Sequence, residues 1–366
     1  MKVASVRLTP FSLPLTHAVH FSTGVLTAAE HLLVEVETDD GIVGVAEAIP
    51  RPMIYGETRA SIEAAVDELI APAITGLPID ALEQIGHRLR NVKGNPVAKG
   101  SVELALFDAL GRSLGISCHH LLGGYADSVA VTAILGWGDP DQVAENAASL
   151  NRRHGIESFK VKVGRDVTTD IATVRRLRET LPGALICPDA NHGYTASEAL
   201  TFIRGAADCG LAWVEEPCAA EDLLGRARIV ATGHTPVLGD ESAITSREAA
   251  TEVLDGRSSM ISIKLARTGV RESIRIREFC AAAGAGVIVG SQGDSTIGTW
   301  ASVSFAAASP VTAAQPAELA YYLDLEGSLC AQDPEIVDGR MAVPTKPGFG
   351  ADIDRSRLDD CRAVAA

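Results

Sequence analysis

The chain has 366 residues, of which 46% are hydrophobic and 22% are charged, and its formal net charge is -15. This hydrophobic content excludes a disordered protein, and the length suggests a barrel of about 250 residues together with a smaller domain. The acidic balance argues against a nucleic-acid partner, because binding to nucleic acid requires a basic face.

The cysteines and the N-terminus indicate the cellular compartment. Seven cysteines are scattered along the chain without a CxxC pair, which is typical of reduced thiols rather than of a disulfide framework or a zinc site. The first residues lack the apolar core and cleavage pattern of a signal peptide, and no segment is apolar and long enough to span a bilayer. We therefore expect a soluble, cytoplasmic protein without a membrane partner.

The first 125 residues predict an α+β domain. Residues 1–50 have the pattern of strands, with a hairpin turn at residues 39–41. Apolar periodicity predicts helices over residues 58–75 and 96–115. Strands followed by helices are typical of an α+β unit, and the paired glycines at 123–124 mark its expected end.

From residue 126 to residue 320 the chain alternates between short apolar runs and helical segments. Eight runs are predicted strands: one at 129–136, five that each end in a charged residue, one at 285–291 and a less distinct one near 311–319. Strands that alternate with helices predict a barrel of parallel strands. Residues 321–366 lack a further repeat, and we expect them to fold back onto the N-terminal domain.

Five charged residues end consecutive strands of this repeat. They follow one another at intervals of 27, 26, 25 and 24 residues, about the length of one strand and one helix with its loops. They are Lys162, Asp189, Glu215, Asp240 and Lys264. The carboxyl ends of parallel strands converge on one mouth of a barrel. One such residue alone is more often a solvent-facing loop residue, but five at a nearly constant period predict a functional site.

The three acids of this series offer only oxygen ligands, which favours one Mg²⁺ or Mn²⁺ ion over zinc or copper. A substrate carboxylate bound there could acquire a second negative charge as an enediolate, because the cation stabilises that charge. The two lysines then predict an acid and a base for a proton alpha to the carboxylate. Lys160 has two interpretations: it lines the same mouth and eases loss of a proton from Lys162, or it forms a structural ion pair.

Together, the Lys-x-Lys, Asp-x-Asn, Glu-Glu-Pro, Asp-Glu-Ser and Ile-Lys motifs resemble the enolase superfamily, in its muconate lactonizing enzyme subgroup. The resemblance covers nearly the whole chain. It implies an α+β capping domain on a modified TIM barrel, (β/α)7β, with one Mg²⁺ or Mn²⁺ ion on the three acids and the two lysines as opposed acid and base. The absence of a histidine beyond His234 separates the chain from mandelate-racemase-like members.

The subgroup contains muconate cycloisomerases, o-succinylbenzoate synthases, N-acylamino-acid racemases and dipeptide epimerases. Residues 21–58, 94–111 and 290–299 resemble muconate lactonizing enzymes of the actinobacterial type. Dipeptide epimerases typically carry Asp-x-Asp after the eighth strand, where this chain has Asp-Leu-Glu at 324–326. The sequence therefore favours a muconate cycloisomerase of aromatic-compound catabolism, which converts cis,cis-muconate to muconolactone through an enolate. It leaves open a dipeptide or N-acylamino-acid epimerase, and it disfavours an inactive binding barrel because all five charged residues are present.

Further residues are assigned to supporting and substrate-binding roles. Asn191 is expected to support the metal site, Asp294 to hydrogen-bond the second lysine or the substrate, and Glu318 to donate to a bound carboxylate if protonated. Phe21 and Tyr55 are candidate lid residues over the substrate, with aromatic packing at a domain junction as the alternative. The expected partners are a small carboxylate substrate and further copies of the chain in a homo-oligomer.

Overall fold

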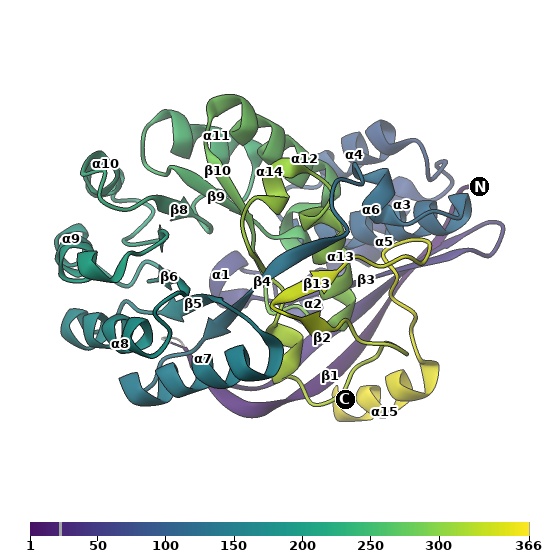
Figure 1. Cartoon of the computed structure of the whole chain (residues 1–366). Coiled ribbons are helices and arrows are strands. Elements are labelled where there is room, and N and C mark those ends of the chain that lie inside the picture. Colours follow the sequence, from purple (N-terminus) through teal and green to yellow (C-terminus); the bar gives the residue numbers. More distant parts are fainter. Residues whose placement is uncertain (22–23, 366) are drawn as a thin grey trace.

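The computed structural model describes residues 1–21 and 24–365, leaving aside the side chains of residues 18–21, 24–26 and 363–365. An antiparallel N-terminal sheet with its helices lies beside a larger unit of mostly parallel strands surrounded by helices (Figure 1). This is the α/β architecture with a separate N-terminal sheet that the sequence predicts.

The N-terminal sheet is a meander of three antiparallel strands. In order across the sheet they are β1 (Val3–Phe21), β2 (Gly24–Thr38) and β3 (Val43–Ala48). The predicted hairpin at residues 39–41 is confirmed, because β2 ends and β3 begins on either side of it and the Thr38 amide donates to the Ile42 carbonyl at 2.9 Å. Leu32, Val34 and Val36 of the central strand are fully buried.

A group of helices follows this sheet in the chain, and the longest of them packs on β2 and β3. They are α1 (Pro52–Tyr55), α2 (Arg59–Ala64), the π-helix η1 (Ala65–Ile70), α3 (Ala71–Ile74), α4 (Leu82–Asn91), α5 (Pro96–Leu114) and α6 (Cys118–Leu121). Helix α5 packs directly on β3: a Cβ atom at Gly44 would come within 2.1 Å of the Ala105 carbonyl oxygen. The helix predicted over residues 58–75 contains a π turn, in which the Ala71 amide bonds to the Val66 carbonyl just before Pro72, a residue without an amide hydrogen.

The larger unit contains the eight predicted strands in parallel. They run in the order β10-β9-β8-β7-β6-β5-β4, and β11 pairs with β4 on its other side. In the described part of the chain β10 and β11 share no hydrogen-bonded ladder. The strands are β4 (Ser128–Leu135), β5 (Ser158–Lys162), β6 (Leu185–Asp189), β7 (Val214–Glu215), β8 (Val237–Gly239), β9 (Met260–Ile263), β10 (Gly286–Val289) and β11 (Ala317–Glu318).

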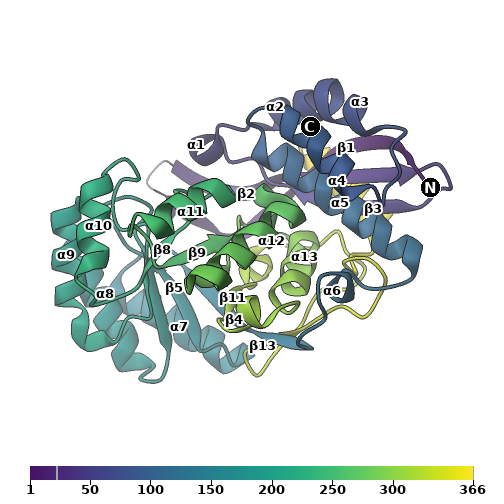
Figure 2. The same cartoon turned by 90° about the horizontal axis from the view of Figure 1, so that it is seen from above.

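Helices follow the strands and surround them (Figure 2). They are α7 (Pro140–His154), α8 (Val167–Thr180), α9 (Ala196–Gly205), the short η2 (Ala207–Cys209), α10 (Leu223–Ala231), α11 (Ser246–Leu254), α12 (Leu265–Ala283), α13 (Thr296–Ala306) and α14 (Pro310–Ala313). Local sequence sets several of their starts. Helices α9 and α11 each begin with a capping box, Thr195 with Glu198 and Thr245 with Glu248, which satisfies the free amides of the first turn.

The C-terminal segment divides between the two parts of the molecule. It consists of η3 (Tyr321–Asp324), β12 (Ile336–Val337), β13 (Arg340–Ala342) and α15 (Arg355–Ala365). Helix α15 packs on β1, and Arg355 pairs with Glu35 at 2.5 Å (Figure 1). Strand β13, however, pairs antiparallel with the first residues of β4, which β11 leaves unpaired. An open strand edge attracts any chain that can pair with it, so the tail returns to the N-terminal part and also completes the larger sheet.

We propose that the chain divides into an N-terminal domain, a barrel domain and a C-terminal segment, with boundaries near residues 125 and 320.

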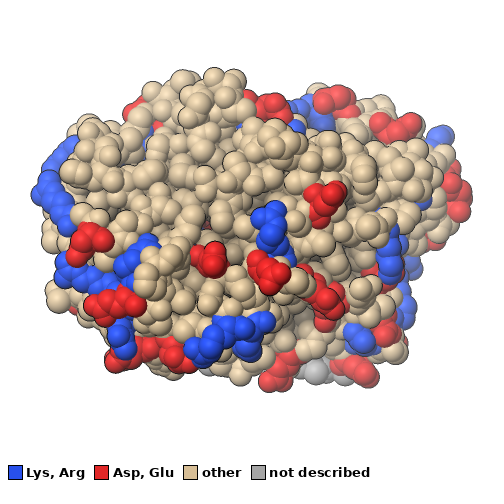
Figure 3. Space-filling view, viewed as in Figure 1, with Lys and Arg blue, Asp and Glu red and all other residues tan. Residues whose placement is uncertain are grey.

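Charged side chains of both signs are interspersed on the face of the molecule seen in Figure 3. Within the described residues no helix has the length and apolar character required to cross a bilayer.

Candidate active site

The structure brings the five predicted residues together at the carboxyl ends of adjacent strands. Lys162, Asp189 and Glu215 are the last residues of β5, β6 and β7. The ladder places Lys162 beside Asp189, and Asp189 beside Glu215. Asp240 and Lys264 follow β8 and β9 by one residue. The even spacing in the sequence thus becomes a row of neighbouring side chains in space.

Lys162 lies at one end of this row. Its Nζ donates to Asp189 Oδ2 and to Asn191 Oδ1, both at 2.6 Å. The backbone N–H of Asn191 donates in turn to Asp189 Oδ1 at 2.9 Å, and the φ of Asn191 is 40°. Asn191 therefore orients both the lysine and the acid, which is a positioning role and requires no direct contact with a ligand.

Lys160 is buried at the centre of three acids. Its Nζ lies 2.8 Å from Glu215, 3.0 Å from Glu318 and 3.1 Å from Asp189. Burial by itself would lower the pKa of Lys160, but the charges of these acids outweigh it and raise that pKa well above its usual value. Of the two interpretations of Lys160, the geometry matches the ion-pair one.

We expect Lys160→Met to destabilise the protein strongly. Removing one partner of a buried ion pair costs about 3–5 kcal/mol, since the other charge stays buried without compensation. At about 2–4 °C per kcal/mol the melting temperature should fall by roughly 6–20 °C, which circular dichroism can follow. Lys346→Met, at an exposed lysine paired with Asp352, is the matched control and should change little. An unchanged melting temperature in Lys160→Met would show that the ion pairs of Lys160 contribute nothing to the stability of the fold.

Lys264 lies at the opposite end of the row. Its Nζ pairs with Asp240 Oδ2, and Arg267 Nη2 approaches Asp240 Oδ1 at 2.8 Å. Burial alone would raise the pKa of Asp240, but the Arg267 and Lys264 charges hold it well below its usual range. Burial likewise opposes the charge of Lys264, and Asp240 outweighs it and raises the Lys264 pKa. Lys264 is therefore an ammonium ion in this arrangement, held by its ion pair with Asp240.

Glu215 has one oxygen without a partner. Its Oε1 accepts from Lys160, whereas its Oε2 is buried and makes no hydrogen bond to any described residue. Burial, followed by the charge of Asp189, raises the Glu215 pKa well above its usual value. An orphaned carboxylate oxygen among like charges fits a divalent cation, because hard cations take oxygen ligands and neutralise such repulsion. The residues present therefore fit the expected Mg²⁺ or Mn²⁺ ion.

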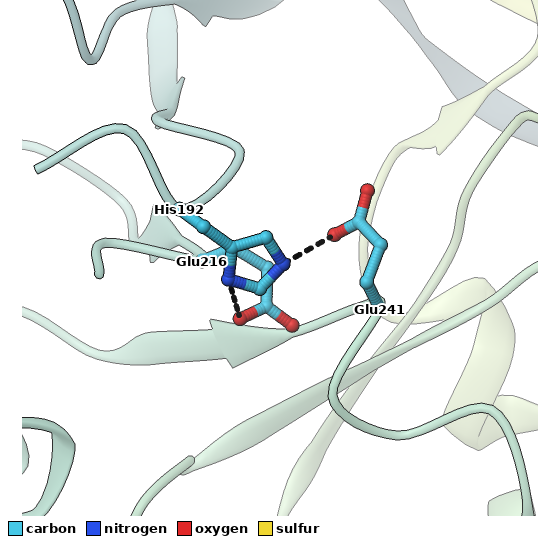
Figure 4. A group of neighbouring side chains, drawn as sticks. All are labelled: His192, Glu216 and Glu241. Carbon is cyan, nitrogen blue, oxygen red and sulfur yellow. Dashed lines mark ion pairs between the residues drawn. The ribbon is translucent and has the colours of Figure 1, made fainter. Parts of the chain in front are cut away.

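A second cluster, His192 with Glu216 and Glu241, lies beside the row (Figure 4). Within the described residues this is the group whose potential ligand atoms all lie within 4.8 Å of one another. Its groups are already engaged, however. Glu216 accepts from Arg226 at 2.5 Å and from the Ser242 amide and hydroxyl at 2.9 and 2.6 Å.

The imidazole of this cluster is charged. His192 Nδ1 lies 3.1 Å from the Cys218 carbonyl. Burial opposes its charge, but the bond to Glu241 and the charges of Glu216 and Glu241 raise the His192 pKa to about 9. The contacts of His192 with Glu216 and Glu241 make the cluster an ion-pair network, and a metal bound here would have to displace the imidazole proton.

The raised pKa makes a pH-dependent contribution to stability. The folded protein binds the His192 proton more tightly than the unfolded chain, whose pKa is near 6.5, so the stabilisation is complete below pH 6.5 and disappears as pH rises through about 9. The melting temperature of His192→Gln should therefore lie below that of the parent at pH 6 and approach it at pH 9.5. His234→Gln, at an exposed histidine, is the control. A constant difference across this range would rule out His192 titration as the cause.

The remaining predicted residues lie around the row. Glu318 joins it, accepting from Lys160 and, through Oε2, from the Ser291 amide at 2.8 Å. The sequence predicts that Asp294 hydrogen-bonds the second lysine or the substrate. Its Oδ2 accepts from Ser302 at 3.3 Å, and no hydrogen bond joins it to the second lysine in the described structure, while the contact with substrate stays a prediction. Burial and the charge of Glu47 raise the Asp294 pKa to about 7, so it belongs to the buried junction with the N-terminal sheet.

Of the two predicted lid residues, the structure describes the side chain of Tyr55 but not that of Phe21. Tyr55 accepts a hydrogen bond from Arg267 Nη1 at 2.7 Å, which connects α1 to Asp240 at the mouth. Phe21 ends β1, but its side chain lies outside the described residues. The sequence missed Arg267, although it stands three residues after Lys264 and so on the same side of the first turn of α12. It also missed His192 and Glu216, for which the sequence carries no distinguishing signal.

Two family models cover most of the chain. The description "Mandelate racemase / muconate lactonizing enzyme, N-terminal domain" matches residues 4–123, and "Enolase C-terminal domain-like" matches residues 142–357. The chain belongs to the enolase superfamily. It is therefore an enzyme of a superfamily whose members use a divalent metal, usually Mg²⁺.

Within the enolase superfamily the chain is similar to proteins with different reactions. The structure of a muconate lactonizing enzyme from Mycobacterium smegmatis, complexed with muconolactone, is 41% identical over 99% of both chains, with a TM-score of 0.97. The L-Ala-D/L-Glu epimerase of Bacillus subtilis is 33% identical over 84% of this chain and 85% of its own. A dipeptide epimerase structure from Enterococcus faecalis, with Mg and L-Leu-L-Tyr, is 28% identical over 96% and 99%, with a TM-score of 0.90.

Proposed function

We propose that this enzyme is a muconate cycloisomerase, which converts cis,cis-muconate to muconolactone. The observation that carries the choice of reaction is the 41% identity over 99% of the chain to the muconate lactonizing enzyme that binds muconolactone. The site is compatible with that chemistry, since it places an ammonium group at each end of a row of three acids.

We further propose that Asp189, Glu215 and Asp240 hold one Mg²⁺ or Mn²⁺ ion. The support is the oxygen-only donor set and the orphaned Glu215 oxygen. When bound, such an ion supplies positive charge that stabilises the additional negative charge developing on a substrate carboxylate. Lys160 holds Asp189 and Glu215 at fixed positions through its ion pairs.

The two lysines perform the proton transfer in this proposal. One carboxylate oxygen of muconate forms a C–O bond to the nearer carbon of the distant double bond. The electron pair of that double bond then moves to the carbon alpha to the second carboxylate. A lysine ammonium donates its proton to that carbon, and the neutral lysine recovers a proton from solvent. Since Lys162 and Lys264 lie at opposite ends of the row, the one that donates determines whether addition is syn or anti.

The second candidate is a dipeptide or N-acylamino-acid epimerase. The 33% identity to the Bacillus subtilis epimerase favours it, and the same two lysines would exchange a proton alpha to the substrate carboxylate from either side. Against this candidate, the chain lacks the Asp-x-Asp motif expected after the eighth strand. Asp324, at that place, lies in η3, and its carbonyl accepts a hydrogen bond from the Thr16 hydroxyl.

One assay separates the two candidates. With purified enzyme and Mg²⁺, we expect the ultraviolet absorbance of cis,cis-muconate to fall, and NMR of the product formed in D₂O to show deuterium on a single face of the alpha carbon. Deuterium on one face or the other identifies the donating lysine. No loss of absorbance, together with alpha-proton exchange in a dipeptide or N-acylamino acid, would overturn the cycloisomerase and support the epimerase.

We also propose a cytoplasmic location, a role in aromatic-compound catabolism and assembly into a homo-oligomer. The seven cysteines are all free and six of them are buried, which suits a reducing compartment. The catabolic role rests on muconate as the substrate.

A further inference from the structure

Arg51 differs from the other inward-facing arginines because it has no acidic partner. Its Nη2 donates to the Gln292 carbonyl at 2.5 Å and its Nη1 to the Pro50 carbonyl at 3.2 Å. Among the described residues no carboxylate lies within 4 Å of its guanidinium. The four buried arginines each have one; they are Arg226, Arg257, Arg267 and Arg277.

The position of this unpaired cation is built into the fold. Arg51 precedes α1 in the N-terminal part, and its guanidinium reaches across to the loop between β10 and α13. Gly293 in that loop has a φ of 91°, which favours glycine, and a Cβ atom there would come within 2.2 Å of Arg51 Nη2, so the guanidinium lies directly against this backbone. Burial lowers the pKa of Arg51, and the charges of the more distant Asp294 and Glu47 offset this only in part.

Two further polar atoms beside Arg51 also lack partners. The hydroxyl of Tyr321, at the start of η3 after the eighth strand, is buried and makes no hydrogen bond to any described residue. Among the ionisable groups around it, Arg51 exerts the largest charge effect on that phenol. The Oε1 atom of Gln292 is likewise buried without a donor, while its Nε2 donates to the Ile49 carbonyl. A guanidinium that bonds only to backbone carbonyls, beside a phenol without any partner, describes a place for an anion.

This place is connected to the row of acids through hydrogen-bonded neighbours. The residue before Gln292 is Ser291, whose amide bonds to Glu318, and Glu318 bonds to Lys160. On the other side, α1 ends at Tyr55, which bonds to Arg267 beside Asp240. Arg51 therefore lies where the N-terminal part covers the strand ends.

We infer that Arg51, together with Tyr321, binds the second carboxylate of a dicarboxylate substrate whose first carboxylate lies at the row of acids. This inference rests on the proposed function for the placement of the first carboxylate, and it defines the substrate class as a short dicarboxylate. A guanidinium binds a carboxylate through two parallel N–H bonds, and here its charge is already desolvated. The same cation repels an ammonium group, so substrates with an amine at the far end are disfavoured.

Equilibrium binding to the Mg²⁺-loaded enzyme tests the inference without requiring turnover. Adipate and hexanoate share a six-carbon chain and differ by one carboxylate, and isothermal titration calorimetry measures the affinity of each. We expect the parent enzyme to bind adipate at least about 10-fold more tightly. In Arg51→Met that ratio should fall to about 2 or less while the hexanoate affinity stays the same, and Arg51→Lys should recover part of it. Arg88→Met, at an exposed arginine of α4, is the matched control.

The outcomes are distinct. A parent enzyme without preference for adipate, or a preference that survives in Arg51→Met, overturns the inference. If Arg51→Met fails to fold by circular dichroism, Tyr321→Phe is measured instead and should reduce the adipate preference several-fold; an unchanged ratio there also overturns it. A preference that depends on Arg51 in an enzyme that leaves muconate unchanged would support the dicarboxylate subsite and refute the cycloisomerase. Muconate turnover by an enzyme whose adipate preference does not depend on Arg51 would support the cycloisomerase and refute the dicarboxylate subsite.

Discussion

Lys162→Ala and Lys264→Ala should each reduce turnover of the true substrate by at least about 10²–10⁴-fold, the range expected for loss of a positioned acid or base. Each lysine pairs with one acid of the row, Asp189 or Asp240, and each lies at one end of it. Neither alanine variant leaves a fully isolated acid, because Lys160 also contacts Asp189 and Arg267 also contacts Asp240. The fold should therefore survive in both.

Steady-state assays with both variants, together with thermal unfolding curves, provide the measurement. Lys346→Ala, which removes an exposed paired lysine, should keep full activity. In a cycloisomerase the lysine that donates the proton is indispensable, whereas the opposite lysine acts through charge and its loss should cost about 10²-fold, the lower end of that range. An epimerase needs both equally, since protons pass on both sides of the substrate. Full activity in either variant would exclude the two-lysine mechanism.

Removal of the divalent ion should abolish activity and lower stability. A chelator is expected to take turnover below detection, and added Mg²⁺ or Mn²⁺ to restore it. An ion that binds only the folded state stabilises it by about 2.7 kcal/mol at 100 times its dissociation constant. The melting temperature of the parent should therefore rise on addition of Mg²⁺, a readout that is independent of catalysis.

Glu215→Gln tests the ligand assignment directly. It replaces the orphaned carboxylate oxygen by an amide in the buried centre of the row, and we expect it to remove the Mg²⁺-dependent rise in melting temperature. Glu221→Gln, at an exposed acid a few residues later, should keep that rise. If Glu215→Gln is stabilised by Mg²⁺ as much as the parent, the ion binds elsewhere, and the cluster of His192, Glu216 and Glu241 becomes the first place to examine.

The sequence predicted the site best where a charged residue ends a short apolar strand. A buried parallel strand reads as a short apolar run, and its carboxyl end must lie at the mouth, so Asp189 and Glu215 could be placed at neighbouring strand ends before any coordinates were known. The same reasoning located the hairpin at residues 39–41, because its turn chemistry is local. It did not foresee that residues of the C-terminal tail would pair with β4, since a strand edge has no signature in the sequence of the chain that fills it.

Adjacent acids show the limit most clearly. Glu215 and Glu216 are chemically identical in the sequence, yet Glu215 faces Lys160 and Glu216 pairs with the buried Arg226. Successive side chains of a strand point to opposite faces, so one residue of register decides which acid belongs to the site. Glu216 also takes a φ of 37°, which only the surrounding packing can hold.

The sequence by itself determined the strand and helix order, the row of five charged residues and the chemistry that their oxygen and amine groups permit. Tertiary structure alone decided which charged side chains form ion pairs with one another. Arg267 joined Asp240, Lys160 became the centre of three acids, and Arg51 was left without an acidic partner. The reason is physical: the state of a buried charge depends on what lies within about 4 Å of it, and those neighbours come from segments far apart in the chain.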